Sequence, residues 1–182
     1  LSWMLASWLR AGGDATLVFD AVTIVQRDAG NVAVRNPSFE ASGEIAGEGV
    51  LARIAGWATE GTTGISFSGI GVYADNGANP DQDLVAFIRG PGALSQTIAG
   101  LLAGQNYKVT FAYNAALGQT PHLMVSADGA TLFEADVAPV GGTAAYRTAS
   151  TSFTAASDSA TLRFEQTVAD GNQTVLLDDV KV

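Results

Sequence analysis

The stretch that decides the fold is "LVAFIRGPGALSQTIAGLLAGQNYKVTFAYNA", residues 84–115. A period of two organises the side chains near both of its ends, which is typical of β-strands. Gly100 and Gly104 lie between the two runs and favour a loop over a helix. In the first run, one face contains Leu84, Ala86 and Ile88, and the other contains Val85, Phe87 and Arg89. In the second run, one face contains Tyr107, Val109, Phe111 and Tyr113, and the other contains Lys108, Thr110, Ala112 and Asn114.

More strands are predicted on the C-terminal side of this stretch. "HLMVSADGATLF" (122–133) predicts two strands joined by an Asp-Gly turn at 128–129, the strongest hairpin signal in the chain. The runs "YRTASTSFTA", "ATLRFEQT" and "QTVLLDDVKV" follow, and nothing after residue 30 has a convincing helical period. Strands of this number and length predict an all-β, antiparallel β-sandwich of jelly-roll or immunoglobulin-like topology.

Composition argues against several classes of protein. A chain of 182 residues fits one domain with a substantial core. The 9 Lys and Arg residues form no basic run and the net charge is −9, so we expect no nucleic-acid partner. The sequence has no cysteine, which excludes disulfides and thiolate metal sites. No run approaches the roughly 18 apolar residues of a membrane span, so we expect no membrane insertion.

One internal repeat suggests the domain boundaries. "AGGDATLVFDAVTI" (11–24) aligns without gaps on "ADGNQTVLLDDVKV" (169–182), at an offset of 158 residues. This repeat predicts that residues 1–30 are a linker or the tail of a preceding copy, with one extra strand at about 14–26, and that residues 31–182 are a complete domain. The alternative is a chance match between two β-strands. The identical pairs are Ala11/Ala169, Gly13/Gly171, Thr16/Thr174, Asp20/Asp178 and Val22/Val180.

The order of motifs along the chain resembles that of a known family. "NPSFE" (36–40), "IAGW" (54–57), the stretch 84–115 and the terminal "LLDDVKV" (176–182) are similar to the galactose-binding-like jelly rolls, over about residues 31–182. These include the family 4/9 and family 22 carbohydrate-binding modules and related repeats in large secreted bacterial proteins. The resemblance implies jelly-roll topology, a poly- or oligosaccharide as partner, and a secreted or cell-surface location.

The same resemblance implies a structural calcium ion where the first and last strands meet. Carried onto this chain, its ligands are Glu40 and Asp178, with Asp179 as a further candidate, completed by main-chain carbonyl oxygens. Calcium takes about six to eight oxygen ligands, so this donor set suits it. We expect Phe39 to face the core and Glu40 to point the other way. In the alternative, Glu40 caps a turn and Asp178 accepts hydrogen bonds from loop amides.

Candidate catalytic groups are few. His122 is the only histidine, follows Pro121 at the start of a predicted strand and lacks a G-x-S-x-G context. Paired carboxylates could hydrolyse glycosides, but the acidic residues cluster in turn-like sequences such as "ADNGANPDQD" (74–83). That segment lacks the glycine and glutamate positions of an EF-hand and is interpreted as a solvated loop, with a cation site as the alternative. We therefore expect a protein that is not an enzyme.

A sugar site requires an aromatic plane for the apolar face of a pyranose and planar polar side chains for its hydroxyls. If residues 84–90 and 106–115 are neighbouring strands, then Phe87, Arg89 and Asn114 line one groove, with His122 beside them. Two alternatives stay open: Trp57 as a core residue under the first loop, and the Phe87 face as a packing surface. The candidates off the predicted core are Trp57, Tyr73, Phe87, Arg89, Asn114, His122 and Tyr146.

Two functions follow from these observations. The first is a non-catalytic carbohydrate-binding module of a secreted multidomain bacterial protein, stabilised by calcium. The second is a structural or adhesive repeat module of a surface or filament protein. It would self-associate through residues 14–26, because a spare strand offers an open edge to another chain. The repeat favours the second function, and the order of motifs favours the first.

Overall fold

The computed structural model describes residues 32–42, 50–51, 53–67, 73 and 76–182. Residues Val32–Val182 form one compact unit. The tail predicted at 1–30, with its strand at 14–26, lies outside the described residues. In the part of the chain that the structure describes, no helix is long and apolar enough to cross a membrane.

The architecture is all-β, as the alternating pattern predicts. The hydrogen-bonded order of strands is β6-β5-β8-β3-β9-β4-β7, every neighbouring pair is antiparallel, and β2 pairs with both β1 and β3. The elements are the 3-10 helix η1 (Glu40–Ser42) and the strands β1 (Val50–Leu51), β2 (Ala58–Phe67), β3 (Leu84–Ala99), β4 (Asn106–Ala115), β5 (His122–Ala127), β6 (Ala130–Asp136), β7 (Arg147–Thr154), β8 (Ser159–Gln166) and β9 (Thr174–Lys181).

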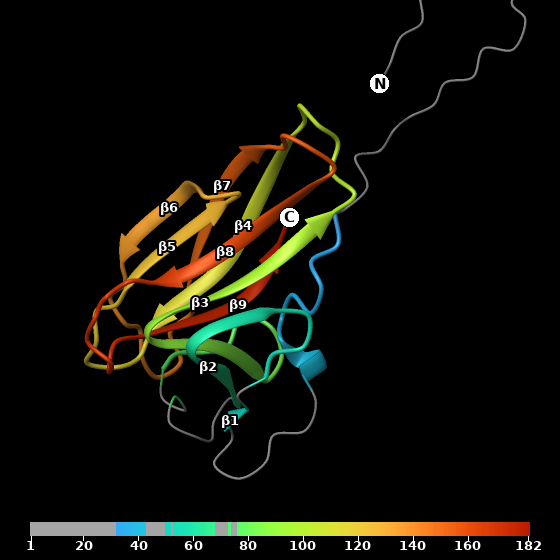
Figure 1. Ribbon diagram of the computed structural model, residues 1–182. Coiled ribbons are helices and arrows are strands. Elements are labelled where there is room, and N and C mark those ends of the chain that lie inside the picture. Colours follow the sequence, from blue (N-terminus) through green and yellow to red (C-terminus); the bar gives the residue numbers. More distant parts are fainter. Residues whose placement is uncertain (1–31, 43–49, 52, 68–72, 74–75) are drawn as a thin grey trace, which may run out of the picture. The chain divides into compact units, whose positions relative to one another are not determined.

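The sheet divides into two layers at the middle of β3. Residues 86–89 of this strand pair with β9, and residues 92–99 pair with β8. Between them, Gly90 has a φ of 63°, a conformation that a Cβ atom disfavours, and Pro91 has no N–H to donate to a partner strand. The strand therefore crosses from one layer to the other at this point. One layer contains β6, β5, β8 and the second half of β3, and the other contains β9, β4 and β7 (Figure 1).

The main core fills the space between the layers. Leu84, Ala86 and Ile88 lie in this core, while Val85 and Phe87 belong to a second, smaller cluster on the outside of the sheet. The predicted assignment of β3 to two opposing faces is thus confirmed. The largest fully buried side chains are Phe39, Phe111, Phe164, Ile54, Ile65, Ile88, Leu94, Ile98, Leu123, Leu162, Leu176 and Leu177.

The predicted hairpin between β5 and β6 is also confirmed. Asp128 and Gly129 have φ angles of 48° and 81°, so both central residues of the turn are left-handed. This is the geometry for which Asp-Gly is preferred, because neither residue is strongly penalised there. The Asp128 carboxylate also accepts a hydrogen bond from the Thr161 amide at 2.8 Å, which joins the turn to β8.

The opening motif "NPSFE" forms a tight turn rather than the beginning of a strand. Asn36 and Phe39 have φ angles of 49° and 65°, and the Asn36 side chain accepts a hydrogen bond from the Ala41 amide at 2.8 Å. Phe39 is fully buried in the main core, as expected. The Val180 amide donates to the Pro37 carbonyl at 2.9 Å, so the opening turn and the last strand lie side by side.

Candidate functional site

The outward side of β3, β9 and β4 brings several predicted site residues together. Phe87 lies opposite Leu176, and Leu176 lies opposite Asn114, so the three form one row across three strands. The prediction that Phe87, Arg89 and Asn114 share one face is therefore correct. We call this side the covered face, and its residues are Val85, Phe87, Arg89, Ala112, Asn114, Leu176 and Asp178.

Loops cover most of this face, so it does not form the open groove that the sequence suggested. Phe87 is 5% exposed and Asn114 is fully buried. The Asn114 amide nitrogen donates to the Asn76 and Val140 carbonyls at 2.5 and 3.1 Å, and its oxygen accepts from the Val140 amide at 2.8 Å. Tyr146 packs into the same cluster. The amide of Asn114 is thus used within the protein, and the face is mainly a packing surface.

One corner of the covered face remains accessible. Tyr73 is half-buried, with its ring centroid 5.4 Å from that of Phe87. Burial raises the pKa of its hydroxyl, and a hydrogen bond with Thr174 and the positive charge of Arg89 partly offset this. The exposed Arg89 guanidinium donates to the Gly171 carbonyl at 3.3 Å and to the Asn172 side chain at 3.1 Å. This group, which we call the Tyr73–Arg89 corner, combines an aromatic ring with planar polar side chains.

Trp57 does not belong to this site. Its side chain is 7% exposed and lies in the main core, 5.6 Å from the Phe39 ring and 6.0 Å from the Phe164 ring. The indole N–H donates to the Asn36 carbonyl at 3.2 Å, which anchors the opening turn. The core interpretation of Trp57 therefore replaces the sugar-contacting one, because the indole is buried against core aromatic rings.

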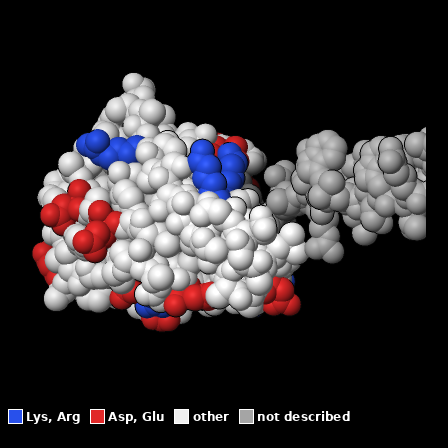
Figure 2. Space-filling view, turned by 90° about the horizontal axis from the view of Figure 1, so that it is seen from above, with Lys and Arg blue, Asp and Glu red and all other residues white. Residues whose placement is uncertain are grey.

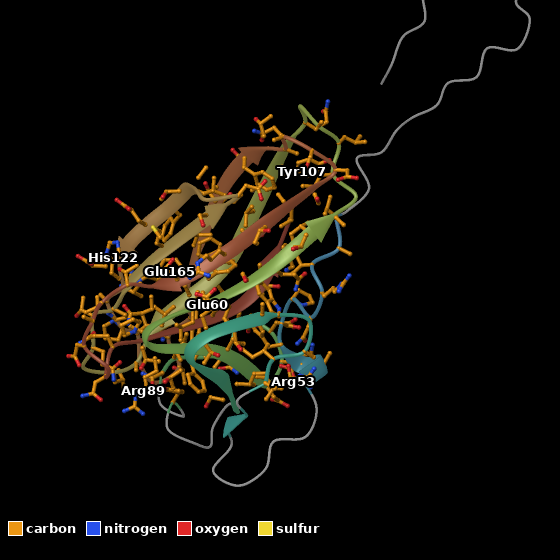
Figure 3. The ribbon with its side chains drawn as sticks, viewed as in Figure 1. Arg53, Glu60, Arg89, Tyr107, His122 and Glu165 are labelled. Atoms are coloured by element: carbon orange, nitrogen blue, oxygen red, sulfur yellow. The ribbon has the colours of Figure 1, made fainter. Side chains whose placement is uncertain are left out.

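His122 lies apart from Arg89 rather than beside it (Figure 3). It begins β5, and its Nδ1 atom is 2.7 Å from an Asp136 carboxylate oxygen on β6. Its side chain is 33% exposed and that of Asp136 is 76% exposed, so the pair faces solvent. The groove predicted to include His122 with Phe87 is therefore wrong, because β5 belongs to the other layer.

The two carboxylates predicted as calcium ligands converge on one loop. Glu40 accepts hydrogen bonds from the Asp83 and Leu84 amides at 2.9 and 2.6 Å, and Asp178 accepts from the Asp81 amide at 2.9 Å. Loop residues 81–84 thus lie against both side chains. These contacts match the alternative in which the carboxylates accept amide hydrogen bonds. The described residues contain no cluster of three or more acidic or histidine side chains suited to a metal.

Asp178 nevertheless has an unusual environment for an acidic residue. It is fully buried, and burial raises the pKa of its carboxyl group to about 7, with nearby Asp81 and Asp179 contributing in the same direction. Amide hydrogen bonds from Asp81 and Asp179 partly offset this rise in pKa. The cation nearest in sequence, Lys181, pairs with Asp179 at 2.8 Å. The groups that contact the Asp178 carboxylate are thus backbone N–H donors, and the carboxylate itself is the oxygen ligand that this place could offer to a cation.

The opposite layer carries a polar cluster that sequence reasoning missed. The Arg163 guanidinium donates to both Glu60 oxygens at 2.7 and 2.8 Å and to Glu165 at 3.1 Å. These hydrogen bonds raise the pKa of Arg163, Glu60 contributing most, and lower the pKa of Glu60. Together with Met124, which lies opposite Glu165, they form what we call the open face. Glu60 is 103 residues from Arg163 in the sequence, so no local pattern indicates this pair.

Surface charge shows no broad basic area in the view of Figure 2. Lys and Arg side chains form two small groups with uncharged surface between them, and acidic side chains lie near the rim. This arrangement agrees with the net charge of −9. Phosphate-rich partners bind clustered cations, and this view shows no broad cluster of them.

Comparison with known proteins supports the fold and leaves the ligand open. No family model and no curated protein matches the sequence. A Stig cyclase from Fischerella sp. TAU, crystallised with a 3H-indole compound, is 15% identical at a TM-score of 0.64, covering 83% of this chain and 95% of its own. The K1 cleaved adhesin domain of Lys-gingipain from Porphyromonas gingivalis W83 is also 15% identical, at a TM-score of 0.52, with 74% and 92% covered.

A carbohydrate-binding module, TmCBM61 in complex with β-1,4-galactotriose, is 18% identical at a TM-score of 0.46, covering 83% of this chain and 96% of its own. At such identities, similarity extends to the fold alone. The fold is the galactose-binding-like jelly roll, which the order of sequence motifs had indicated. A cyclase and an adhesin domain both occur among the similar structures, so the fold does not decide the function.

Proposed function

We propose that this galactose-binding-like jelly roll is a non-catalytic carbohydrate-binding module of a secreted bacterial protein, with its sugar site at the Tyr73–Arg89 corner. The observation that carries the proposal is the position of a half-buried Tyr73 ring beside an exposed, hydrogen-bonded Arg89 guanidinium. An aromatic ring contacts the apolar face of a pyranose, and a planar guanidinium binds vicinal hydroxyls with two N–H donors.

The surroundings of this corner support the same ligand class. Phe87 lies behind the Tyr73 ring and holds its position. Asn172 presents a side-chain amide that already contacts Arg89 at 3.1 Å, so it adds donors and an acceptor at the same place. The open face has a guanidinium too, but Glu60 and Glu165 engage Arg163. A neutral ligand is therefore expected at the corner rather than on the open face.

A panel of soluble glycans tests the proposal. Affinity electrophoresis or a glycan array would cover β-glucans, xylans, mannans and galactans. We expect binding to at least one class, and at least a tenfold loss of affinity in Arg89→Ala, since one charge-assisted hydrogen bond contributes about 1.5–3 kcal/mol. Because Arg89 is exposed, this variant should keep the melting temperature of the parent protein.

Arg163→Ala provides the matched control, because it removes the same side chain from the open face. It should bind the glycan as the parent does. Loss of binding in Arg163→Ala but not in Arg89→Ala would move the site to the open face. No binding by the folded protein to any glycan of the panel would contradict the proposed function itself.

We further propose a structural calcium ion between the opening turn and the last strand. Glu40 and Asp178 would contribute carboxylate oxygens, and loop residues 81–84 with neighbouring main-chain carbonyls would complete the set. Two observations support this: both carboxylates contact the same loop, and Asp178 is buried without a directly paired cationic side chain among the described residues. The ion would neutralise that charge and fix the loop to β9.

Thermal melting in calcium and in chelator tests the ion. A ligand at about 100 times its Kd adds about 2.7 kcal/mol, which raises the Tm of a domain of this size by roughly 5–11 °C. Glu40→Gln should remove most of that rise, whereas Asp136→Asn, at an exposed carboxylate on β6, should keep it. Equal melting temperatures with calcium and with chelator would exclude a structural ion.

The absence of catalysis is part of the proposal. His122 pairs with Asp136 at the solvent-facing end of a hairpin. Among the described residues, this pair has neither a nucleophilic side chain beside it nor an enclosed reaction site. The similarity to cyclases does not argue otherwise, because it is a similarity of fold. Release of reducing sugar from a glycan that the protein binds would contradict this part.

A further inference from the structure

We propose that residues 11–24 encode a second strand of the β9 type, whose binding site is the β9 position between β3 and β4 in another copy of this jelly roll. The inference rests on the sequence of this segment and on the surroundings of β9. It is independent of sugar and calcium binding, and it concerns the repeat that those functions leave unexplained.

The matches between the two segments fall where β9 is buried. Within the strand, the identical pairs are Thr16/Thr174, Asp20/Asp178 and Val22/Val180. In β9 these positions are 1%, 0% and 0% exposed. A chance resemblance between two strands has no reason to preserve a buried threonine and a buried aspartate, because neither residue type is favoured inside a sheet.

The remaining apolar positions agree as well. Leu17, Val18 and Phe19 correspond to Val175, Leu176 and Leu177, and those three residues of β9 are fully buried. Val175 and Leu177 lie in the main core, whereas Leu176 lies in the second cluster. The segment is therefore apolar toward both sides of the sheet, as a strand must be when both of its faces are covered.

Strand β9 is central, and this defines the partner. It pairs with β3 through residues 174–177 and with β4 through residues 175–178 and 181. A segment that copies β9 needs hydrogen bonds along both of its edges and apolar contacts on both faces. Only the space between a β3 and a β4 offers all of these together. A second copy of the roll supplies that space once its own β9 is displaced.

Two positions predict that the segment fits this place less well than β9 does. Asp179 has a φ of 49° at the bulge between β4 and β9, and Ala21 replaces it in the segment. Alanine tolerates the left-handed conformation less well than aspartate does. Phe19 also replaces Leu177, which is completely enclosed, so the core must accommodate a larger side chain.

A cassette exchange tests whether the segment is a β9-type strand. In the full chain, residues 169–182 would be replaced by a copy of residues 11–24. We expect a cooperatively folding β protein by circular dichroism, with a Tm about 2–8 °C below that of the parent because of the alanine at the left-handed position. A version that restores aspartate there should recover part of the loss, and a scrambled cassette should not fold. Failure of the aspartate-restored cassette to fold would overturn the proposal.

A pair of full-length variants tests exchange between copies. Leu177→Asp with Val180→Asp disables β9 and leaves residues 11–24 intact. We expect this variant to gain β structure as its concentration rises, with the mass of a dimer or larger species by light scattering. Adding Phe19→Asp and Val22→Asp at the matching positions of residues 11–24 should abolish both the gain of β structure and the formation of the dimer or larger species. A folded monomer, or equal behaviour of the two variants, would exclude a second copy as the partner.

Discussion

The outward sides of β8 and β9 meet different surroundings, although the two strands have the same length and are both central in the sheet. On β9, Leu176 and Asp178 are fully buried beneath loops of the covered face. On β8, Arg163 and Glu165 remain half-buried on the open face and interact with each other and with Glu60. Alternation along a strand therefore defines which residues point outward, but not whether those residues meet solvent.

Loop segments held by a few specific contacts, rather than another sheet, cover the covered face. Tyr73 and, from the segment 137–146, Val140 and Tyr146 belong to the second cluster, and Asn114 binds Asn76 and Val140. On the open face, no comparable loop lies over the described strands, and polar side chains occupy the surface. The covered face should thus contribute to stability, and the open face should tolerate substitution.

The largest expected difference between the faces comes from removing a large side chain. Phe87→Ala should destabilise the protein by about 3–5 kcal/mol, because Phe87 is 5% exposed between Tyr73 and Leu176. Met124→Ala, at a half-buried position on the open face, should cost less than about 1 kcal/mol. Urea unfolding followed by circular dichroism measures both free energies.

Equal losses in Phe87→Ala and Met124→Ala would show that the loops over the covered face do not pack on it. A small loss in both would mean that the second cluster opens at little cost. In either case the corner formed by Tyr73 and Arg89 would lack the rigid support that its proposed function requires, because Phe87 supports the Tyr73 ring.

A smaller but more specific effect is expected at Asn114. Asn114→Ala leaves the Val140 amide and the Asn76 and Val140 carbonyls without their side-chain partner in a buried place. An unsatisfied buried polar group costs about 1–3 kcal/mol. We therefore expect the free energy of unfolding to fall by about 3 kcal/mol once the surrounding loops have adjusted. Hydrogen exchange should show faster exchange at the amide of Val140.

Ser95→Ala is the control for this substitution, because Ser95 is a small polar residue on the open face with no side-chain hydrogen bond among those of the described residues. Its effect should be within about 0.5 kcal/mol. An Asn114→Ala variant as stable as Ser95→Ala would show that water replaces the amide without penalty, and the loops would then be held by apolar contacts alone.

Sequence patterns predicted the framework because local physics determines it. The period of two assigned Leu84 and Phe87 to opposite faces, and the Asp128-Gly129 pair located the hairpin, since both depend on neighbouring residues only. The meeting of the opening segment with the last strand was implied by the family resemblance, and the hydrogen bond between Val180 and Pro37 confirms it. The calcium ligands and the sugar ligand stay predictions.

The site was less predictable because it depends on contacts between distant segments. Nothing in the sequence near Asn114 indicates that its amide binds Asn76 and Val140, respectively 38 and 26 residues away. Trp57 is a residue type that often contacts sugars, and only the packing of Phe39 and Phe164 against it shows that it is a core residue. The prediction placed His122 in the same layer as Phe87, which is wrong, because the alternation of side chains along a strand does not reveal the order of strands in the sheet.

The smallest expected effect concerns the ion pair of the open face. Arg163 and Glu60 are joined by two hydrogen bonds, but Glu60 faces solvent, which screens the attraction. In a double-mutant cycle with Arg163→Ala and Glu60→Ala, the coupling should shift the Tm by less than about 2 °C. Differential scanning calorimetry at low and high salt measures it.

The dependence of this coupling on pH follows from the pKa of Glu60, which Arg163 lowers below the usual value for a glutamate. The contribution of the ion pair to the free energy of unfolding is therefore present above the ordinary pKa of a glutamate carboxyl. It is lost as the pH falls through the lowered pKa of Glu60. Added salt should weaken it in the same direction. A coupling that is insensitive to both salt and pH would mean that Arg163 acts through the packing of its aliphatic stem over Ala93 and Ser95, which would make the open face more like the covered one.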